Sequence, residues 1–162
     1  SKKASRTESS HEAEPELTMI VGTYTSGDSK GLYSFRFNEE NGTATALSEA
    51  EVENPSYLVP SADGKFIYAV SEFSNDQAAA NAFAFNKEEG TFRLLNTQKT
   101  EGEDPCYIIT NGSNVITANY SGGSISVFPI DKDGSLLPAS TVVKFKGSGE
   151  TAPALCPHHT GR

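Results

Sequence analysis

A repeat about fifty residues long restricts the fold of this chain more than any other feature of its sequence. Residues 35–38 (Phe-Arg-Phe-Asn) return as 83–86 (Phe-Ala-Phe-Asn), and residues 54–58 (Asn-Pro-Ser-Tyr-Leu) return as 104–108 (Asp-Pro-Cys-Tyr-Ile). A third unit begins near residue 124. Self-similarity with such a period is typical of solenoids and propellers, in which each unit is one supersecondary structure that packs on its neighbours.

Each unit contains short strands that are separated by turn sequences. Residues 31–38 alternate between two sets of side chains, and this period of two indicates a β-strand. Asn41-Gly42 and Asp63-Gly64 are dipeptides that favour tight turns between strands. Four short strands in a unit of this length are typical of one propeller blade. We therefore predict an all-β fold of four-stranded antiparallel blades, with repeat units near 31–73, 81–123 and 124–162.

Composition and charge exclude several classes of function. The formal net charge of -8 argues against nucleic-acid binding, which needs clustered Lys and Arg. No apolar run approaches the ~18 residues of a membrane span, and no Cys/His spacing resembles a zinc site, so we expect neither a span nor a metal or other cofactor. Cys106 and Cys156 are interpreted as two separate thiols. A disulfide stays open, because a sequence does not show whether two Cα atoms come within ~7 Å.

The first eighteen residues differ in character from the rest of the chain. They are rich in Ser, Glu and Lys and have few apolar side chains, so they cannot bury enough surface to offset the entropy of ordering. We expect a disordered polar leader over 1–18 and a partial propeller domain over 19–162. A polar tether before a β-domain would suit a lipid-anchored precursor in the cell envelope, and an expression leader would look the same.

One long segment resembles a known family. Residues 118–128 (Ala-Asn-Tyr-Ser-Gly-Gly-Ser-Ile-Ser-Val-Phe), with 21–25 (Val-Gly-Thr-Tyr-Thr) and the two proline-containing repeat segments, resemble the seven-bladed β-propeller lactonases. That group includes the propeller-type 6-phosphogluconolactonases and the carboxymuconate cycloisomerases. The resemblance covers roughly 19–149, and it implies a cytoplasmic enzyme that hydrolyses a sugar lactone without a cofactor.

The family's Pro-His-x-His motif, whose histidines face the central cavity, is only partly present. Residues 156–160 read Cys-Pro-His-His-Thr, so Pro157 and His158 match the motif while the second family histidine would fall on Thr160. The resemblance implies that His158 is the catalytic general base, which deprotonates the water that attacks the lactone carbonyl. His159 is displaced by one position, and we place it among the substrate-binding residues.

The repeat draws attention to two further pairs of residues. Glu72 and Asn119 come at the ends of corresponding strands, where they could contact the substrate or cap a turn. Tyr57 and Tyr107 both follow the repeat proline by two residues, and we interpret them as packing inside the blade cores.

Two other functions stay open, because a repeat indicates a fold before it indicates a function. The chain could be a lactone-forming cycloisomerase, or a non-catalytic propeller that serves as an interaction platform. Seven blades would need roughly 340 residues, whereas this sequence holds two complete units and most of a third. We therefore expect the 162-residue chain to be inactive by itself, and to self-associate through unpaired strand edges.

Overall fold

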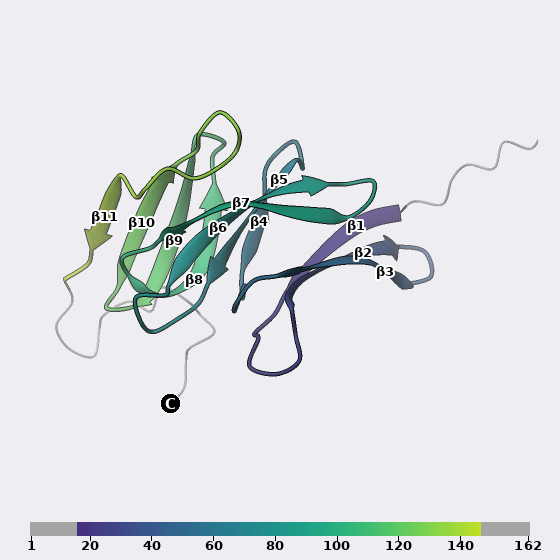
Figure 1. Cartoon of the computed structure of the whole chain (residues 1–162), viewed down its shortest axis with the longest axis horizontal. Coiled ribbons are helices and arrows are strands. Elements are labelled where there is room, and N and C mark those ends of the chain that lie inside the picture. Colours follow the sequence, from purple (N-terminus) through teal and green to yellow (C-terminus); the bar gives the residue numbers. More distant parts are fainter. Residues whose placement is uncertain (1–15, 147–162) are drawn as a thin grey trace, which may run out of the picture.

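The computed structural model describes residues 16–146, and within that range it consists of strands, turns and loops without a helix (Figure 1). The strands form three antiparallel sheets, named here blades 1, 2 and 3 in chain order. Blade 1 contains β1 (Glu16–Gly22), β2 (Gly31–Asn38) and β3 (Ala44–Glu51); blade 2 contains β4 (Leu58–Pro60), β5 (Phe66–Ser71), β6 (Ala79–Asn86) and β7 (Thr91–Lys99); blade 3 contains β8 (Glu103–Thr110), β9 (Asn114–Ser121), β10 (Ser124–Pro129) and β11 (Thr141–Lys144).

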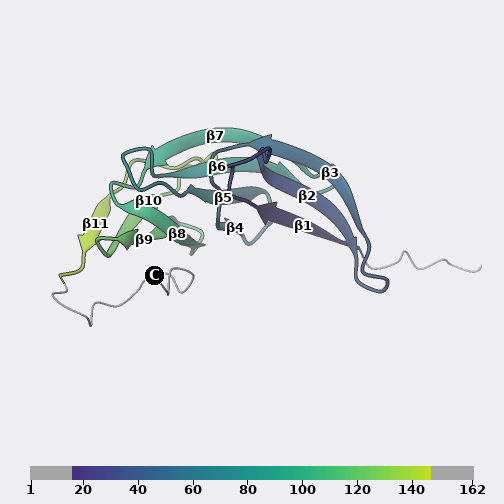
Figure 2. The same ribbon diagram turned by 90° about the horizontal axis from the view of Figure 1, so that it is seen from below.

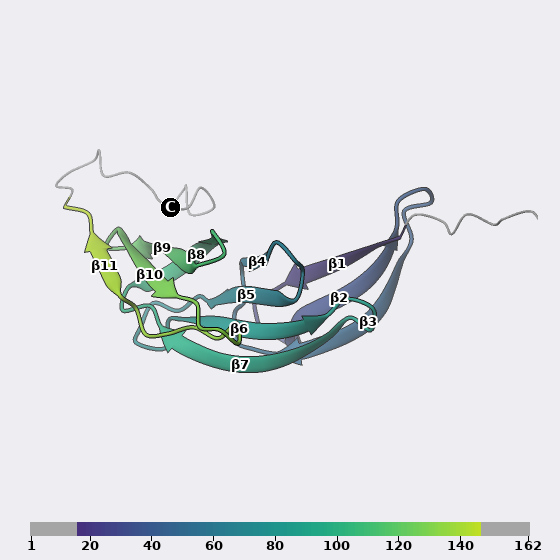
Figure 3. The same cartoon turned by 90° about the horizontal axis from the view of Figure 1, so that it is seen from above.

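The three blades are arranged along an arc. Strands β1, β4 and β8 lie on its concave side, and β3 and β7 run along its convex side (Figures 2 and 3). Each strand pairs antiparallel with its sequence neighbour in the same blade. The prediction of an all-β, partial propeller is confirmed.

The repeat in the sequence is also a repeat in backbone geometry. A bulge shifts the register of β2 against β3 between Ser34 and Phe35, and a bulge shifts β6 against β7 between Ala82 and Phe83. The turns that follow β2 and β6 contain Gly42 with φ 71° and Gly90 with φ 72°, in the left-handed region that glycine adopts without steric cost. Equivalent sequence positions therefore form the same bulge and the same turn in blades 1 and 2.

Alternate residues of one strand hold neighbouring blades together. On β5, Ile67 and Ala69 belong to the core between blades 1 and 2, while Tyr68 and Val70 belong to the core between blades 2 and 3. All four are essentially inaccessible to solvent, because a strand in a middle blade is covered on both faces. Burial of each large apolar side chain of this kind contributes about 1.5–3 kcal/mol to folding.

Blade 1 differs from the other two in its number of strands. Strand β1 corresponds to β5 and β9 by its pairing with the next strand in the chain, so among residues 16–146 nothing occupies the place that β4 and β8 hold in blades 2 and 3. Strand β1 begins at Glu16, three residues before the expected start of the domain, because Leu17 and Thr18 continue the pairing with β2. The part of the chain that the structure describes has no helix long and apolar enough to cross a membrane.

Candidate functional site

The residue before each repeat proline connects two blades at the ends of their strands. Asn54 has φ 45°, a left-handed conformation that Asn adopts more readily than most other residues. Its Oδ1 accepts hydrogen bonds from the backbone N of Thr25 at 2.9 Å and from Thr25 Oγ1 at 3.0 Å. Its Nδ2 donates to the carbonyl oxygen of Glu72 at 3.2 Å. Asn54 thus joins the loop after β1 of blade 1 to the end of β5 in blade 2.

Asp104 repeats this arrangement between blades 2 and 3. It has φ 53°, and its backbone N donates to the carbonyl oxygen of Phe73 at 2.8 Å, in the segment after β5. Its carboxylate accepts a hydrogen bond from Ser121 Oγ at the end of β9. We call Asn54 and Asp104 the clamp residues. They fix the relative positions of the strand ends, and so they place the polar groups that follow those strands.

One of these polar groups is Glu72, which is buried directly after β5. Tyr24, in the loop after β1, donates its phenol hydrogen bond to the Glu72 carboxylate. The pKa of Tyr24 rises to about 12, because the hydroxyl is buried, donates this hydrogen bond and lies near the negative charges of Glu72 and Asp104. The neighbouring Ser56 hydroxyl lowers the pKa of Tyr24. The phenol is therefore neutral at any physiological pH; its single O–H is donated to Glu72, and its oxygen can still accept a hydrogen bond.

Ser56 lies beside this pair, and its hydroxyl interacts with the Tyr24 phenol. Its Oγ is buried, and within residues 16–146 no group meets the geometry of a hydrogen bond to it, although it is near enough to Tyr24 to influence the phenol. Buried polar atoms in proteins are almost always paired, and the Tyr24 phenol oxygen is the neighbour that this hydroxyl interacts with.

Asn119 lies in a different environment, inside blade 3. It is fully buried; its Nδ2 donates to Ser124 Oγ and Ser126 Oγ, both at 3.0 Å, and its Oδ1 accepts from Thr117 Oγ1 at 3.1 Å. Gly102 packs directly against the Asn119 amide, where a Cβ would come within 2.4 Å of Nδ2. The side chain connects β9 to β10. Its expected contact with substrate stays a prediction, and the bonds found here are structural.

Tyr57 and Tyr107 were expected inside the blade cores, and this interpretation is wrong. Tyr57 precedes β4 and Tyr107 lies on β8, and they remain 37% and 42% exposed. Their ring centroids are 4.9 Å apart with the planes inclined at 46°. On β8 the residue that enters the core is Ile108, which is fully buried, while Tyr107 and Ile109 share the exposed face. Strand β4, which follows Tyr57, and strand β8, which contains Tyr107, lie on the concave side of the arc (Figures 2 and 3).

The predicted histidines, His158 and His159, lie outside the described residues. Cys106 is disulfide-bonded, so the interpretation of two separate thiols is wrong. The chain's other cysteine, Cys156, follows it by one repeat period and also lies outside the described residues. In a repeat fold, residues one period apart occupy equivalent positions in adjacent units, and a search for such pairs in the sequence would have favoured the disulfide.

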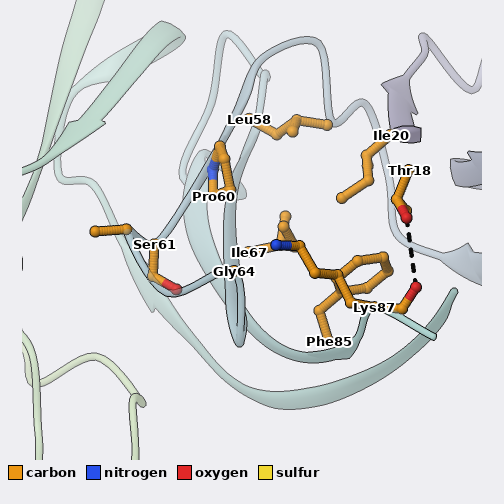
Figure 4. A pocket seen from close by; sticks show the side chains of 10 residues that line it. Thr18, Ile20, Leu58, Pro60, Ser61, Gly64, Ile67, Phe85 and Lys87 are labelled. Carbon is orange, nitrogen blue, oxygen red and sulfur yellow. Dashed lines mark hydrogen bonds between the residues drawn. The ribbon is translucent and has the colours of Figure 1, made fainter. Parts of the chain in front are cut away.

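A cavity of about 370 Å³ lies between blades 1 and 2, next to the unpaired edge of β1 (Figure 4). Its wall is mainly apolar, formed by Ile20, Leu58, Ile67 and Phe85. Among the described residues that line it, Lys87 is the single titratable side chain. Residues 16–146 also contain no group of three or more His, Cys, Asp or Glu side chains that could hold a metal ion.

Comparison with known proteins shows the origin of this architecture. The family model described as "Lactonase, 7-bladed beta-propeller" matches residues 18–161. The chain belongs to the seven-bladed β-propeller lactonase family. A 6-phosphogluconolactonase of Bacillus subtilis (strain 168) is 35% identical over 144 residues, which are 85% of this chain and 40% of that protein.

Two solved structures show the same likeness in three dimensions. A candidate 6-phosphogluconolactonase of Bacteroides fragilis NCTC 9343 is 69% identical with a TM-score of 0.83, over 89% of this chain and 40% of that one. A periplasmic gluconolactonase of Pseudomonas aeruginosa is 30% identical with a TM-score of 0.72, over 79% of this chain and 38% of that one. This lactonase chain thus spans about two fifths of the length of these relatives.

Proposed function

We propose that the protein containing this chain hydrolyses a six-carbon sugar lactone, with 6-phosphogluconolactone as the substrate. The observation that carries the proposal is membership of the lactonase family over residues 18–161. It is supported by the relatives named as 6-phosphogluconolactonases, at 35% identity in B. subtilis and 69% in B. fragilis. A small-molecule lactone is then the partner, and a proton acceptor, a water molecule and oxyanion donors are the groups that the reaction needs.

We assign the chemistry to His158 and His159 and to the polar groups that follow β1 and β5. Water attacks the lactone carbonyl, and His158 accepts its proton as the general base, with His159 beside it in the sequence as a contact to substrate. Tyr24 supplies a neutral phenol, with a pKa of about 12, that donates its hydrogen to Glu72 and orients that carboxylate. Glu72 holds that phenol in place and offers its carboxylate to a substrate hydroxyl. Asn119 contributes through the rigidity of blade 3 more than through contact, given the three hydrogen bonds that its side chain already makes.

The preference for a phosphorylated substrate is the part of this proposal that rests most on relatives. The P. aeruginosa neighbour is named a gluconolactonase, without a phosphate in its substrate. A phosphate would be recognised by Arg or Lys at the rim of the concave side. Comparison of the phosphorylated and unphosphorylated lactones in one assay separates the two possibilities.

The test is a hydrolysis assay on the full-length protein that contains this chain, with and without a metal chelator. We expect turnover of 6-phosphogluconolactone that the chelator does not change. His158→Ala should lower kcat by roughly 10²- to 10⁴-fold, the usual share of general-base catalysis. Wild-type turnover in the His158→Ala protein would remove this residue from the mechanism, and the absence of turnover with either lactone would refute the proposed function.

A further inference from the structure

We propose that Tyr57 and Tyr107 form an aromatic platform on which the ring of a sugar stacks on the concave side of the arc. This inference deepens the proposed function and rests on it for the class of ligand. It adds a binding surface to the hydrolytic groups assigned above, and it does not depend on His158 or His159.

The first observation is that the two rings are exposed in spite of their size. Tyr57 and Tyr107 are 37% and 42% exposed, whereas Pro55, Pro105 and Ile108 in the same two segments are buried. A tyrosine ring carries a large apolar surface, and burying it in a core would stabilise the fold. The repeat places both rings at the same position, two residues after the proline, so their exposure belongs to the blade design and is not an accident of one loop.

The second observation is the arrangement of the pair. The ring centroids are 4.9 Å apart and the planes are inclined at 46°, so the two rings form one wedge-shaped surface across the boundary of blades 2 and 3. Ile109, 41% exposed on the same strand as Tyr107, extends this surface with an aliphatic side chain. The C–H bonds of a pyranose or lactone ring form a flat, weakly apolar face of matching size, and such faces pack well on aromatic rings.

The third observation is that polar partners lie close by in the chain. Ser56, directly before Tyr57, has a buried Oγ next to the Tyr24 phenol. The Tyr24 phenol oxygen and the Glu72 carboxylate lie near that hydroxyl, and both can accept a hydrogen bond. A site with an apolar ring surface and a few polar groups suits a molecule with one apolar face and several hydroxyls, which is the chemistry of a sugar.

The experiment is saturation-transfer NMR on the full-length protein with glucose 6-phosphate as the probe. This compound keeps a stable six-membered ring, whereas 6-phosphogluconate carries the same phosphate on an open chain and serves as the matched ligand control. We expect transfer from tyrosine ring protons to the C–H protons of glucose 6-phosphate, and weaker binding of 6-phosphogluconate. Equal binding of the two compounds would overturn the platform. Binding of glucose 6-phosphate without magnetisation transfer from tyrosine would overturn it too, and this is the result expected if another blade of the full-length protein covered Tyr57 and Tyr107.

Variants connect the platform to turnover. Tyr107→Leu and Tyr57→Leu should each raise KM for the lactone about 2- to 10-fold with kcat nearly unchanged, because stacking stabilises the substrate and the transition state alike. Tyr107→Phe keeps the ring and should behave as wild type, which separates stacking from the phenol hydroxyl. Should a Leu variant fail to fold, the NMR result on the wild-type protein decides the question.

The outcomes also separate this inference from the proposed function. Normal lactone hydrolysis with an unchanged KM in both Leu variants refutes the platform and leaves the function intact. Absence of hydrolysis together with ring binding that depends on Tyr57 and Tyr107 refutes the function and leaves the platform intact.

Discussion

Replacement of the clamp residue Asn54 should destabilise the protein in two separable ways. Asn54→Ala removes two accepted hydrogen bonds from Thr25 and one donated to Glu72. Each such bond contributes about 0.5–1.5 kcal/mol, and the half-buried position favours the lower part of that range, so we expect a loss of roughly 2–3 kcal/mol. Alanine at φ 45° adds about 1 kcal/mol of backbone strain. The expected total is therefore about 3–4 kcal/mol.

Two matched variants divide this total. Asn54→Gly loses the same bonds without the backbone strain, so it should be less destabilised than Asn54→Ala by about 1 kcal/mol. Asn54→Asp keeps the two accepted bonds and copies the residue at the other clamp, Asp104, so it should lose only about 1 kcal/mol. The assay is urea denaturation monitored by circular dichroism. The denaturation midpoints of the variants are compared, provided that the slope m of the unfolding free energy against urea concentration is the same. A change below 0.5 kcal/mol in Asn54→Ala, as estimated from the usual scatter of surface substitutions, would refute the clamp as an element of stability.

Four other substitutions test the structure at separate points. Gly42→Ala and Gly90→Ala both place a residue with a Cβ in the left-handed region, but only at Gly90 would the Cβ collide with neighbouring side chains. Thermal melting should therefore show that Gly42→Ala lowers the free energy of unfolding by about 1 kcal/mol and that Gly90→Ala lowers it more. The pKa of the Tyr24 phenol rises from 10.0 to about 12 on folding, so the phenol should contribute stability that is complete below pH 10 and lost as the pH approaches 12. The free energies of unfolding of wild type and Tyr24→Phe should therefore converge between these two pH values. Tyrosinate absorbance should show one phenol that titrates later than the others. Asn119→Ala leaves buried hydroxyls without their partner and should cost about 2–3 kcal/mol by denaturation, whereas no loss would contradict the structural role of this amide.

The strand pattern was predictable because it depends on local chemistry. Period-two alternation and the Asn-Gly and Asp-Gly turns indicate strands and hairpins within a few residues of where the structure has them, and the repeat of about fifty residues assigns those strands to blades. Strand β1 begins three residues before the expected start of the domain, because Glu16, Leu17 and Thr18 look like part of a polar leader until their pairing with β2 is known.

The candidate site was less accessible to the same reasoning. The sequence brought Glu72 to the end of a strand, but its contact with Tyr24 joins residues of different blades and needed the arc of the blades to be known. Asn119 was expected near substrate, and its hydrogen-bond partners within blade 3 became visible only in three dimensions. The disulfide of Cys106 was missed because the two cysteines were weighed as isolated residues and not as members of consecutive repeats.

Sequence by itself determined the class of fold and the family, because a strand, a turn and a repeat are all encoded in short stretches of side chains. Tertiary structure alone decided which face of each strand is covered. Alternation shows that Tyr107 and Ile108 point to opposite faces of β8, but only the packing of blade 2 against blade 3 makes Ile108 the buried residue and leaves Tyr107 exposed beside Tyr57. The physical reason is that burial is a property of the neighbouring blade, which the strand's own sequence does not contain.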